Sequence, residues 1–199
     1  MGRMYLCLGL TAVLSGADMP LIDPLGHGLG PAWRYDHITP EDPLIAANWK
    51  PMSRQGDRWR DPVHLTAGAP FVQLLDHAMQ LQTRAPYDGD ALNNLEKWAA
   101  VVFTAPESGV YQVTGELDSN RFEGSGGLSL HIYVRQALPA PGTVLSLAEW
   151  QLPPHAVQPI GLGPVRLARG EELAFMPRCL WRQSGADVIL RNVTARIVP

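Results

Sequence analysis

The residues of this sequence best suited to chemistry are aromatic rings and polar side chains that alternate with apolar ones. A flat aromatic ring stacks on the CH face of a sugar, and nearby polar groups then bind the hydroxyls. Trp49 and Trp59 stand among polar, glycine and proline residues, so we expect these two rings to be exposed. The full set of candidate rings is Trp33, Tyr35, Trp49, Trp59, Trp150 and Trp181. The alternative for each ring, and the expectation for Trp98, is a place in the core.

Two predicted strands present polar side chains on one face. Apolar residues occupy every second position of 111–117 and of 128–134, which places the residues between them on the opposite, wet face. If the two strands pair as a hairpin, these polar residues form one patch that would bind a glycan, although the same pattern is typical of any solvated sheet. With the two exposed rings, the predicted ligand-binding residues are Trp49, Trp59, Gln112, Glu116, His131, Tyr133 and Arg135.

A metal site is predicted in the glycine-rich loop 118–127. Asp118, Asn120 and Glu123 offer hard oxygen ligands in a flexible loop, which suits Ca²⁺. Their spacing does not match a calcium-loop signature, so an ordinary polar loop is the alternative. The six histidines show neither His-x-His nor HExxH spacing, and the sequence alone therefore gives no zinc or copper site.

No catalytic motif is present in the sequence. Paired carboxylates, Asp88 with Asp90 or Glu171 with Glu172, have the chemistry for acid and base catalysis, but such pairs usually lie in surface turns. The sequence lacks a GxSxG elbow and a phosphate-binding glycine loop. Cys7 and Cys179, far apart in sequence, exclude a CxxC site. The sequence therefore favours a protein that is not an enzyme.

Short strands separated by turns must position these residues. The alternation and the turn residues predict strands over 97–104, 111–117, 128–135, 144–150, 160–167, 173–176 and 187–198. Keeping the last strand's apolar residues on one face requires a β-bulge near Arg191 and Asn192. The sequence of residues 17–73 predicts loops with short strands. The apolar positions of 71–81 fit the period of a helix as well as that of a strand. This pattern predicts an all-β fold, a two-sheet antiparallel β-sandwich of jelly-roll type.

Composition and the first residues bear on the compartment. A net charge of -3 gives no basic field, so we expect no nucleic-acid partner. Residues 1–17 combine one arginine, an apolar run and small residues, which predicts a cleaved signal peptide followed by a single domain over 18–199 and a secreted protein. The apolar run is too short to span a membrane. The alternative is a retained segment that packs against a neighbouring subunit.

Several segments resemble a known family. Residues 98–115, 165–175 and 194–197, with the opening 31–35, resemble jelly-roll domains of the carbohydrate-binding-module type found in secreted bacterial proteins. The strand, Ala-Pro-x-x-Gly-x-Tyr, strand pattern also resembles C1q-like and tumour-necrosis-factor-like jelly rolls. Many such modules carry an aspartate where this chain has Glu171 or Glu172, so we expect no ion at this turn. The resemblance implies binding or assembly rather than catalysis.

Together these features predict a secreted, non-catalytic module that binds a polysaccharide or a cell-surface glycan. One alternative is a self-assembling homo-oligomeric subunit, either a C1q-like trimer or a unit of a fibre or coat. A second is a lyase or hydrolase on the same fold, which would need two carboxylates or several histidines in one cleft.

Overall fold

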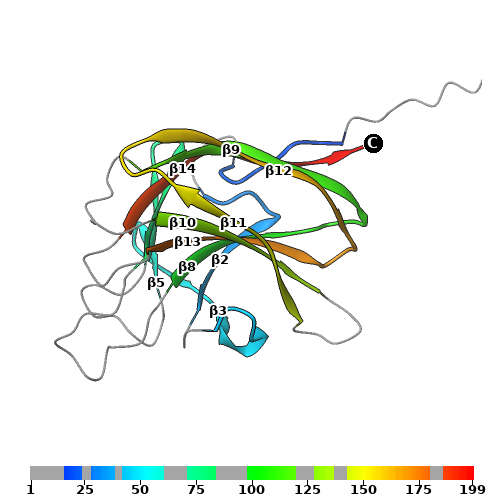
Figure 1. Cartoon of the computed structure of the whole chain (residues 1–199), viewed down its shortest axis with the longest axis horizontal. Helices are drawn as coiled ribbons and strands as arrows, with labels where there is room; N and C mark the ends of the chain where they lie inside the picture. The colour runs from blue at the N-terminus through cyan, green and yellow to red at the C-terminus, as the bar shows by residue number, and fades with distance from the viewer. Residues whose placement is uncertain are drawn as a thin grey trace, which may run out of the picture.

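A computed structural model describes residues 16–23, 28–38, 42–60, 71–83, 98–119, 128–136, 143–179 and 186–199. These residues form two antiparallel sheets packed face to face (Figure 1). In order across it, the six-stranded sheet contains β11 (Val144–Leu152), β10 (Leu128–Arg135), β13 (Glu172–Cys179), β8 (Trp98–Thr104), β2 (Trp33–Ile38) and β3 (Trp49–Pro51). The other sheet contains β12 (Val157–Leu167), β9 (Gly109–Asp118), β14 (Ala186–Val198), β7 (Ala78–Thr83), β6 (Phe71–Leu75), β5 (Arg58–Arg60) and β4 (Ser53–Gln55), with β1 (Met19–Pro20) paired to β14.

The strand order is that of a jelly roll. The eight consecutive strands β7 to β14 divide into the sheets β7-β14-β9-β12 and β8-β13-β10-β11, so the chain crosses repeatedly from one sheet to the other. Two interleaved Greek keys of this kind define the jelly roll. The all-β fold class predicted from the sequence is therefore confirmed. The described part of the chain contains no helix that is long and apolar enough to span a bilayer.

The space between the sheets is filled by the apolar residues of the alternating strands. Tyr111 of β9 is fully buried, and its ring lies 5.3 Å from that of Phe103 in β8. Trp33 of β2 packs on the same phenylalanine at 5.1 Å. The inward-facing side chains of β10 also belong to this core: Leu128, Leu130 and Ile132. The predicted inward faces of 111–117 and 128–134 are thus correct.

The pairing of β9 with β10, on which the predicted polar patch depended, does not occur. β9 pairs with β12 and β14, whereas β10 pairs with β11 and β13 in the other sheet. In a jelly roll, consecutive strands at this position belong to opposite sheets, so the outward faces of β9 and β10 point in opposite directions. The hairpin hypothesis was wrong for this topological reason.

Two local features of the eight-stranded sheet follow from single residues. The ambiguous segment 71–81 forms β6 and β7, joined by a tight turn in which His77 has a φ of 49°. The predicted bulge is present: the register of β14 against β9 shifts between Arg191 and Thr194, and Asn192 has a φ of 52°. The bulge keeps both Leu190 and Val193 in the core.

The outer face of the six-stranded sheet carries a second buried layer. Residues 98–103 of β8 are buried at every position, because their side chains are covered on both faces of the sheet. The second layer consists of Ile38, Trp49, Trp98, Ala100, Val102, Tyr133, Val144, Ala174 and Met176. A strand that is covered on both faces has a continuous apolar sequence, which is the pattern found in 98–103.

Candidate functional site

The outer face of the six-stranded sheet is concave. Trp49 of β3 pairs with Ile38 at one edge of the sheet, while Ile45 forms a bridge with Thr143, directly before β11 at the opposite edge. In a flat sheet these edges would be about 24 Å apart, since five strand spacings separate β3 from β11. Four residues reach only about 14 Å. The sheet must therefore curl, and η1 (Ala46–Asn48) lies in the segment that connects its two edges.

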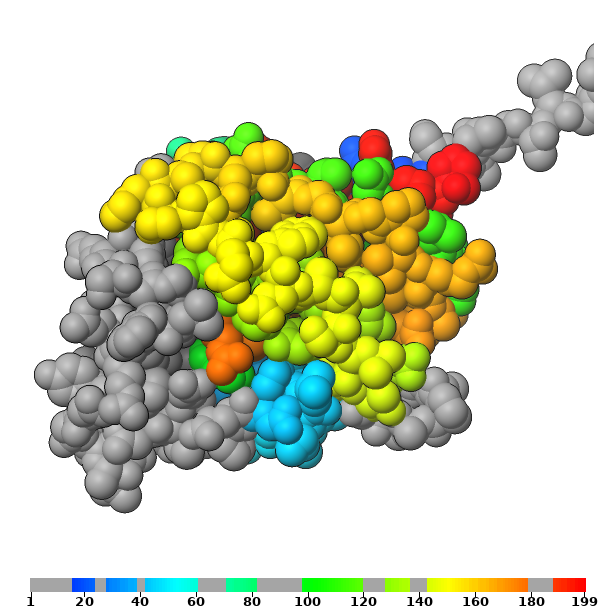
Figure 2. Space-filling model, viewed as in Figure 1, coloured from blue at the N-terminus to red at the C-terminus, as the bar shows by residue number. Residues whose placement is uncertain are grey.

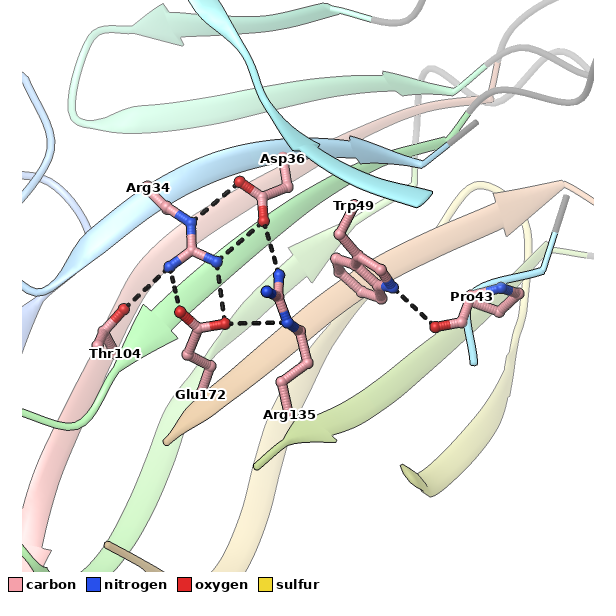
Figure 3. Close-up of polar contacts among 7 residues, drawn as sticks. All are labelled: Arg34, Asp36, Pro43, Trp49, Thr104, Arg135 and Glu172. Carbon is pink, nitrogen blue, oxygen red and sulfur yellow. Dashed lines mark hydrogen bonds and ion pairs between the residues drawn. The ribbon is translucent and has the colours of Figure 1, made fainter. Parts of the chain in front are cut away.

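Trp49 covers the centre of this concave face. Its ring is 6% exposed and meets Tyr133 of β10 edge-on, with 5.8 Å between ring centroids. Its indole Nε1 donates a hydrogen bond of 2.7 Å to the carbonyl oxygen of Pro43, and the guanidinium of Arg135 lies 5.7 Å from the ring (Figure 3). The expectation that Trp49 is exposed was wrong, because the indole fills the hollow of the curled sheet.

A network of four charged side chains lies beside Trp49 on this face. Arg34 donates hydrogen bonds to Asp36 at 3.0 Å and to Glu172 at 2.9 Å (Figure 3). Arg135 approaches the same two carboxylates at 3.3 and 3.2 Å. Burial opposes the charge of Arg34, but the hydrogen bonds that it donates to Glu172 and Asp36, together with the negative charges of these carboxylates, outweigh this effect and raise the pKa of the guanidinium. Each carboxylate is therefore held between two arginines.

A row of polar side chains continues the face along β10 and β11. The register places His131 opposite Glu149 and Ser129 opposite Gln151. Ser129 Oγ lies 2.8 Å from His131 Nε2, Glu149 Oε1 lies 3.8 Å from the same nitrogen, and Gln151 donates a hydrogen bond of 3.2 Å to Glu149. Tyr133 OH lies 3.5 Å from His131 Nδ1. We call Ser129, His131, Glu149 and Gln151 the polar row.

Accessibility and charge differ along the polar row. The side chain of Glu149 is 49% exposed and that of His131 only 8%. Burial lowers the pKa of His131; the charge of Glu149 opposes this shift and that of Arg178 adds to it. Burial likewise raises the pKa of Tyr133. The row thus presents an exposed carboxylate beside a neutral imidazole, a set of hydrogen-bond donors and acceptors fixed by its neighbours.

Arg178 of β13 borders the polar row, because it lies opposite Ser129 in the register of β10 and β13. Its guanidinium lies 4.2 Å from the centroid of the Trp98 ring, a cation–π contact that holds the charge flat against the second apolar layer. The indole itself is 2% exposed. Among the described aromatic residues of this face, Trp49, Trp98 and Tyr133 are all buried, so hydrogen bonds rather than ring stacking would dominate recognition here.

The structure brings together four of the predicted ligand-binding residues and separates three. Trp49, His131, Tyr133 and Arg135 share the concave face. The separated residues lie in the eight-stranded sheet: Trp59, Gln112 and Glu116. Trp59 is half-buried, packs on the Tyr35 ring at 4.9 Å and is not the exposed platform expected. Gln112 accepts a hydrogen bond of 2.9 Å from Arg196 on the outer face of that sheet.

The predicted calcium ligands remain a prediction. Asp118 forms an ion pair of 3.1 Å with Arg191, while Asn120 and Glu123 lie outside the described residues. Within the described ranges, no three histidine, cysteine, aspartate or glutamate side chains converge as a metal site would require. Trp181 and residues 1–15 also lie outside the described part of the chain.

The adjacent glutamates 171 and 172 point to different partners. Glu171 accepts a hydrogen bond of 2.8 Å from the backbone of Ala168 and so closes the turn before β13, whereas Glu172 joins the charged network. They therefore do not form a pair of cooperating carboxyl groups. Asp88 and Asp90, the other predicted pair, lie outside the described residues.

Sequence reasoning missed four charged residues of this face: Arg34, Asp36, Glu149 and Arg178. Their distance along the chain hides them, since Arg34 and Glu172 meet only after the chain has crossed between sheets several times. One signal was available. The continuous apolar run 98–103 already implied that the outer face of its sheet is covered.

Comparisons with known proteins give a likeness of fold. No family model and no curated protein matches the sequence. Among solved structures, the xylan-binding module CBM22-1 of Paenibacillus barcinonensis Xyn10C is 14% identical, with a TM-score of 0.42 over 73% of this chain and 85% of that chain. The family 11 carbohydrate-binding module from Clostridium thermocellum, solved with a mixed-linked tetrasaccharide, is 10% identical, with a TM-score of 0.43 over 90% and 95%.

A further match is the C-terminal family 22 carbohydrate-binding module of Clostridium thermocellum Xyn10B. It is 8% identical, with a TM-score of 0.45 over 86% of this chain and 89% of that chain. The assignment of this chain as a jelly roll rests on the strand order of its two sheets. A similar fold does not show that two proteins bind the same ligand.

Proposed function

We propose that this protein is a secreted, non-catalytic carbohydrate-binding domain that takes its glycan on the concave face of the six-stranded sheet. The observation that carries the proposal is the polar row beside Arg178. Four side chains from two strands present fixed donors and acceptors there, with the exposed carboxylate of Glu149 at the solvent side. The vicinal hydroxyl groups of a sugar both donate and accept hydrogen bonds, so they can pair with the donors and acceptors of the polar row.

The charge balance of the face favours an uncharged glycan. The carboxylates of Asp36 and Glu172 face the guanidinium groups of Arg34 and Arg135, and Glu149 lies near Arg178 across His131. A polyanion would need an excess of positive charge, which this arrangement does not offer. We therefore expect neutral polysaccharides to bind and acidic ones to bind more weakly.

The ion pairs also support binding over catalysis. Glycoside hydrolysis needs one carboxyl group that delivers a proton and a second that acts as base or nucleophile. Asp36 and Glu172 are each held between two guanidinium groups, and Asp36 is 1% exposed. Both carboxylates are thus already engaged as hydrogen-bond acceptors within the chain.

Export of the protein would follow from cleavage of residues 1–17. Met19 is the first residue of β1, the first strand among the described residues, so removal of residues 1–17 would leave every described strand in place. Mass spectrometry of the exported protein tests this directly. We expect a chain that begins at Asp18, and a mass that includes Met1 would contradict export by a cleaved signal.

Affinity gel electrophoresis on a panel of soluble polysaccharides tests glycan binding. The panel contains neutral chains (arabinoxylan, mixed-linked β-glucan and galactomannan) and acidic ones (alginate and polygalacturonate). We expect one or more neutral chains to retard the wild-type protein and His131→Ala to lose most of the retardation. Gln112→Ala, on the outer face of the other sheet, is the matched control and should migrate like wild type. Equal migration of wild-type protein with and without every polysaccharide would contradict the proposal.

A further inference from the structure

One side of the sandwich gathers the exposed apolar side chains. The side is formed by the edge strands β11 and β12 together with the segment that bridges to Thr143, and Figure 2 shows it in yellow, orange and cyan. Five large apolar side chains among the described residues are 43 to 54% exposed, and all of them belong to this side of the sandwich: Leu44, Ile45, Leu145, Leu147 and Val157. A grouping of this kind marks an interaction surface.

The same side is nearly free of charge. From Thr143 to Val165 the sequence contains one residue that is charged at neutral pH, Glu149, although 18% of the whole chain is charged. Depletion of charged residues together with exposed apolar side chains distinguishes the core of a protein interface from ordinary surface.

No contact or backbone conformation within the described chain requires glycine at two positions of β12. A Cβ added at Gly161 or at Gly163 would meet no atom within 4 Å, and both residues are exposed. Neither has a left-handed backbone that would require glycine. A strand glycine with open space above it leaves room for another backbone to approach closely.

We propose that this β11–β12 side is the interface of a homodimer. A surface with Glu149 as the one charged residue between Thr143 and Val165 offers little to select an oppositely charged partner, whereas two copies of it can meet around a two-fold axis through their exposed apolar side chains. β11 also carries Glu149 and Gln151 of the polar row, so this interface adjoins the proposed glycan-binding face. The proposal does not require a bound glycan, because it rests on the exposed apolar side chains and the glycines of the β11–β12 side.

The geometry points to packing centred on β11. Pro159 and Pro164 disfavour a continuous hydrogen-bond ladder between the outer edge of β12 and a strand of a second copy, because proline has no backbone N–H. β11 contains no proline, and beyond the bridge at Thr143 no described strand pairs with its outer edge. Two copies of β11 can therefore lie antiparallel, with the glycines of β12 admitting the partner.

The available area is sufficient for a modest dimer. β11 has nine residues and β12 has eleven, so the side is about 30 Å long at about 3.3 Å per residue. Two sheets about 10 Å apart, with their side chains, make it about 20 Å wide. About 600 Å² per copy gives about 1,200 Å² in total, the lower end of the range for stable complexes.

Sedimentation velocity on the full chain from about 5 µM to about 200 µM tests the proposal. We expect wild type to shift with concentration from 21.8 kDa toward twice that mass. Leu147→Glu should weaken the dimer about tenfold or more, because it would bury a charge at the interface. Gly161→Thr should weaken it as well while leaving the monomer folded, since its side chain meets nothing within the chain.

Gln55→Glu, an exposed position on β4 at the opposite edge of the eight-stranded sheet, is the control and should dimerise like wild type. Circular dichroism of each variant verifies that it is folded. A wild-type monomer at about 200 µM would overturn the proposal. So would a dimer that both Leu147→Glu and Gly161→Thr leave unchanged, or one that only Gln55→Glu weakens.

Discussion

The outer faces of the two sheets differ although both sheets share one core. On the eight-stranded sheet the outward residues of β9 are solvated and bond locally, as Gln112 does with Arg196. On the six-stranded sheet the outward residues form a second buried layer, bordered by the charged network and the polar row. A sandwich needs only one core, so the extra layer on one sheet must contribute something beyond holding the sheets together.

The curl of the six-stranded sheet explains the difference. A concave face can be filled by a single segment, and Trp49 with its neighbours fills it here. The ends of the hollow remain open to polar side chains, which become fixed because the centre is packed. The eight-stranded sheet has no such segment over the described part of β9, and its outer face stays ordinary surface.

The largest expected effect comes from removing the second layer. Trp98→Ala should lower the free energy of unfolding by about 3–5 kcal/mol, because the 2% exposed indole leaves a cavity between the sheet and Arg178. Urea denaturation measures this. A loss below about 1 kcal/mol would mean that the layer contributes little packing.

A smaller effect is expected from the charged network. Asp36→Ala leaves the guanidinium groups of Arg34 and Arg135 without their shared carboxylate, which should cost about 2–3 kcal/mol because the carboxylate is buried while the guanidinium groups remain partly exposed to solvent. Asp36→Asn keeps the shape and should lose less. If the alanine variant unfolds at the same urea concentration as wild type, the network is not a structural element.

The pH dependence of stability should carry a contribution from His131. The unfolded chain protonates this histidine near pH 6.5, whereas burial delays protonation in the folded chain to a lower pH. The free energy of unfolding is therefore highest above pH 6.5 and decreases as the pH falls through that window. His131→Gln should flatten this part of the profile, measured by urea denaturation between about pH 7.5 and about pH 5. An unchanged slope would show that the imidazole is solvated.

The smallest effect is expected on the other sheet. Arg196→Ala removes an exposed hydrogen bond to Gln112 and should change stability by no more than about 0.5 kcal/mol. A cost comparable with that of Asp36→Ala would remove the contrast between the two outer faces.

The fold was largely predictable from the sequence and the site only in part. The alternation in 111–117 and 128–135 depends on local pattern, and so does the bulge near Asn192, so these features were predicted correctly. Which strands share a sheet depends on long-range pairing, and the hairpin of β9 with β10 was therefore wrong. His131, Tyr133 and Arg135 were grouped correctly because they lie on one strand, whereas Glu149 and Arg178 join them only through sheet register.

The most direct test of the central claim compares two glutamates, one on each outer face. Calorimetric titration uses the neutral polysaccharide that retards the protein most, with Glu149→Ala from the polar row and Glu116→Ala from β9. Glu149 is exposed, so its removal should leave the fold intact. The account predicts that Glu149→Ala weakens binding about tenfold or more while Glu116→Ala binds like wild type. Unchanged binding by Glu149→Ala together with a loss in Glu116→Ala would place the glycan on the wrong sheet and contradict the account.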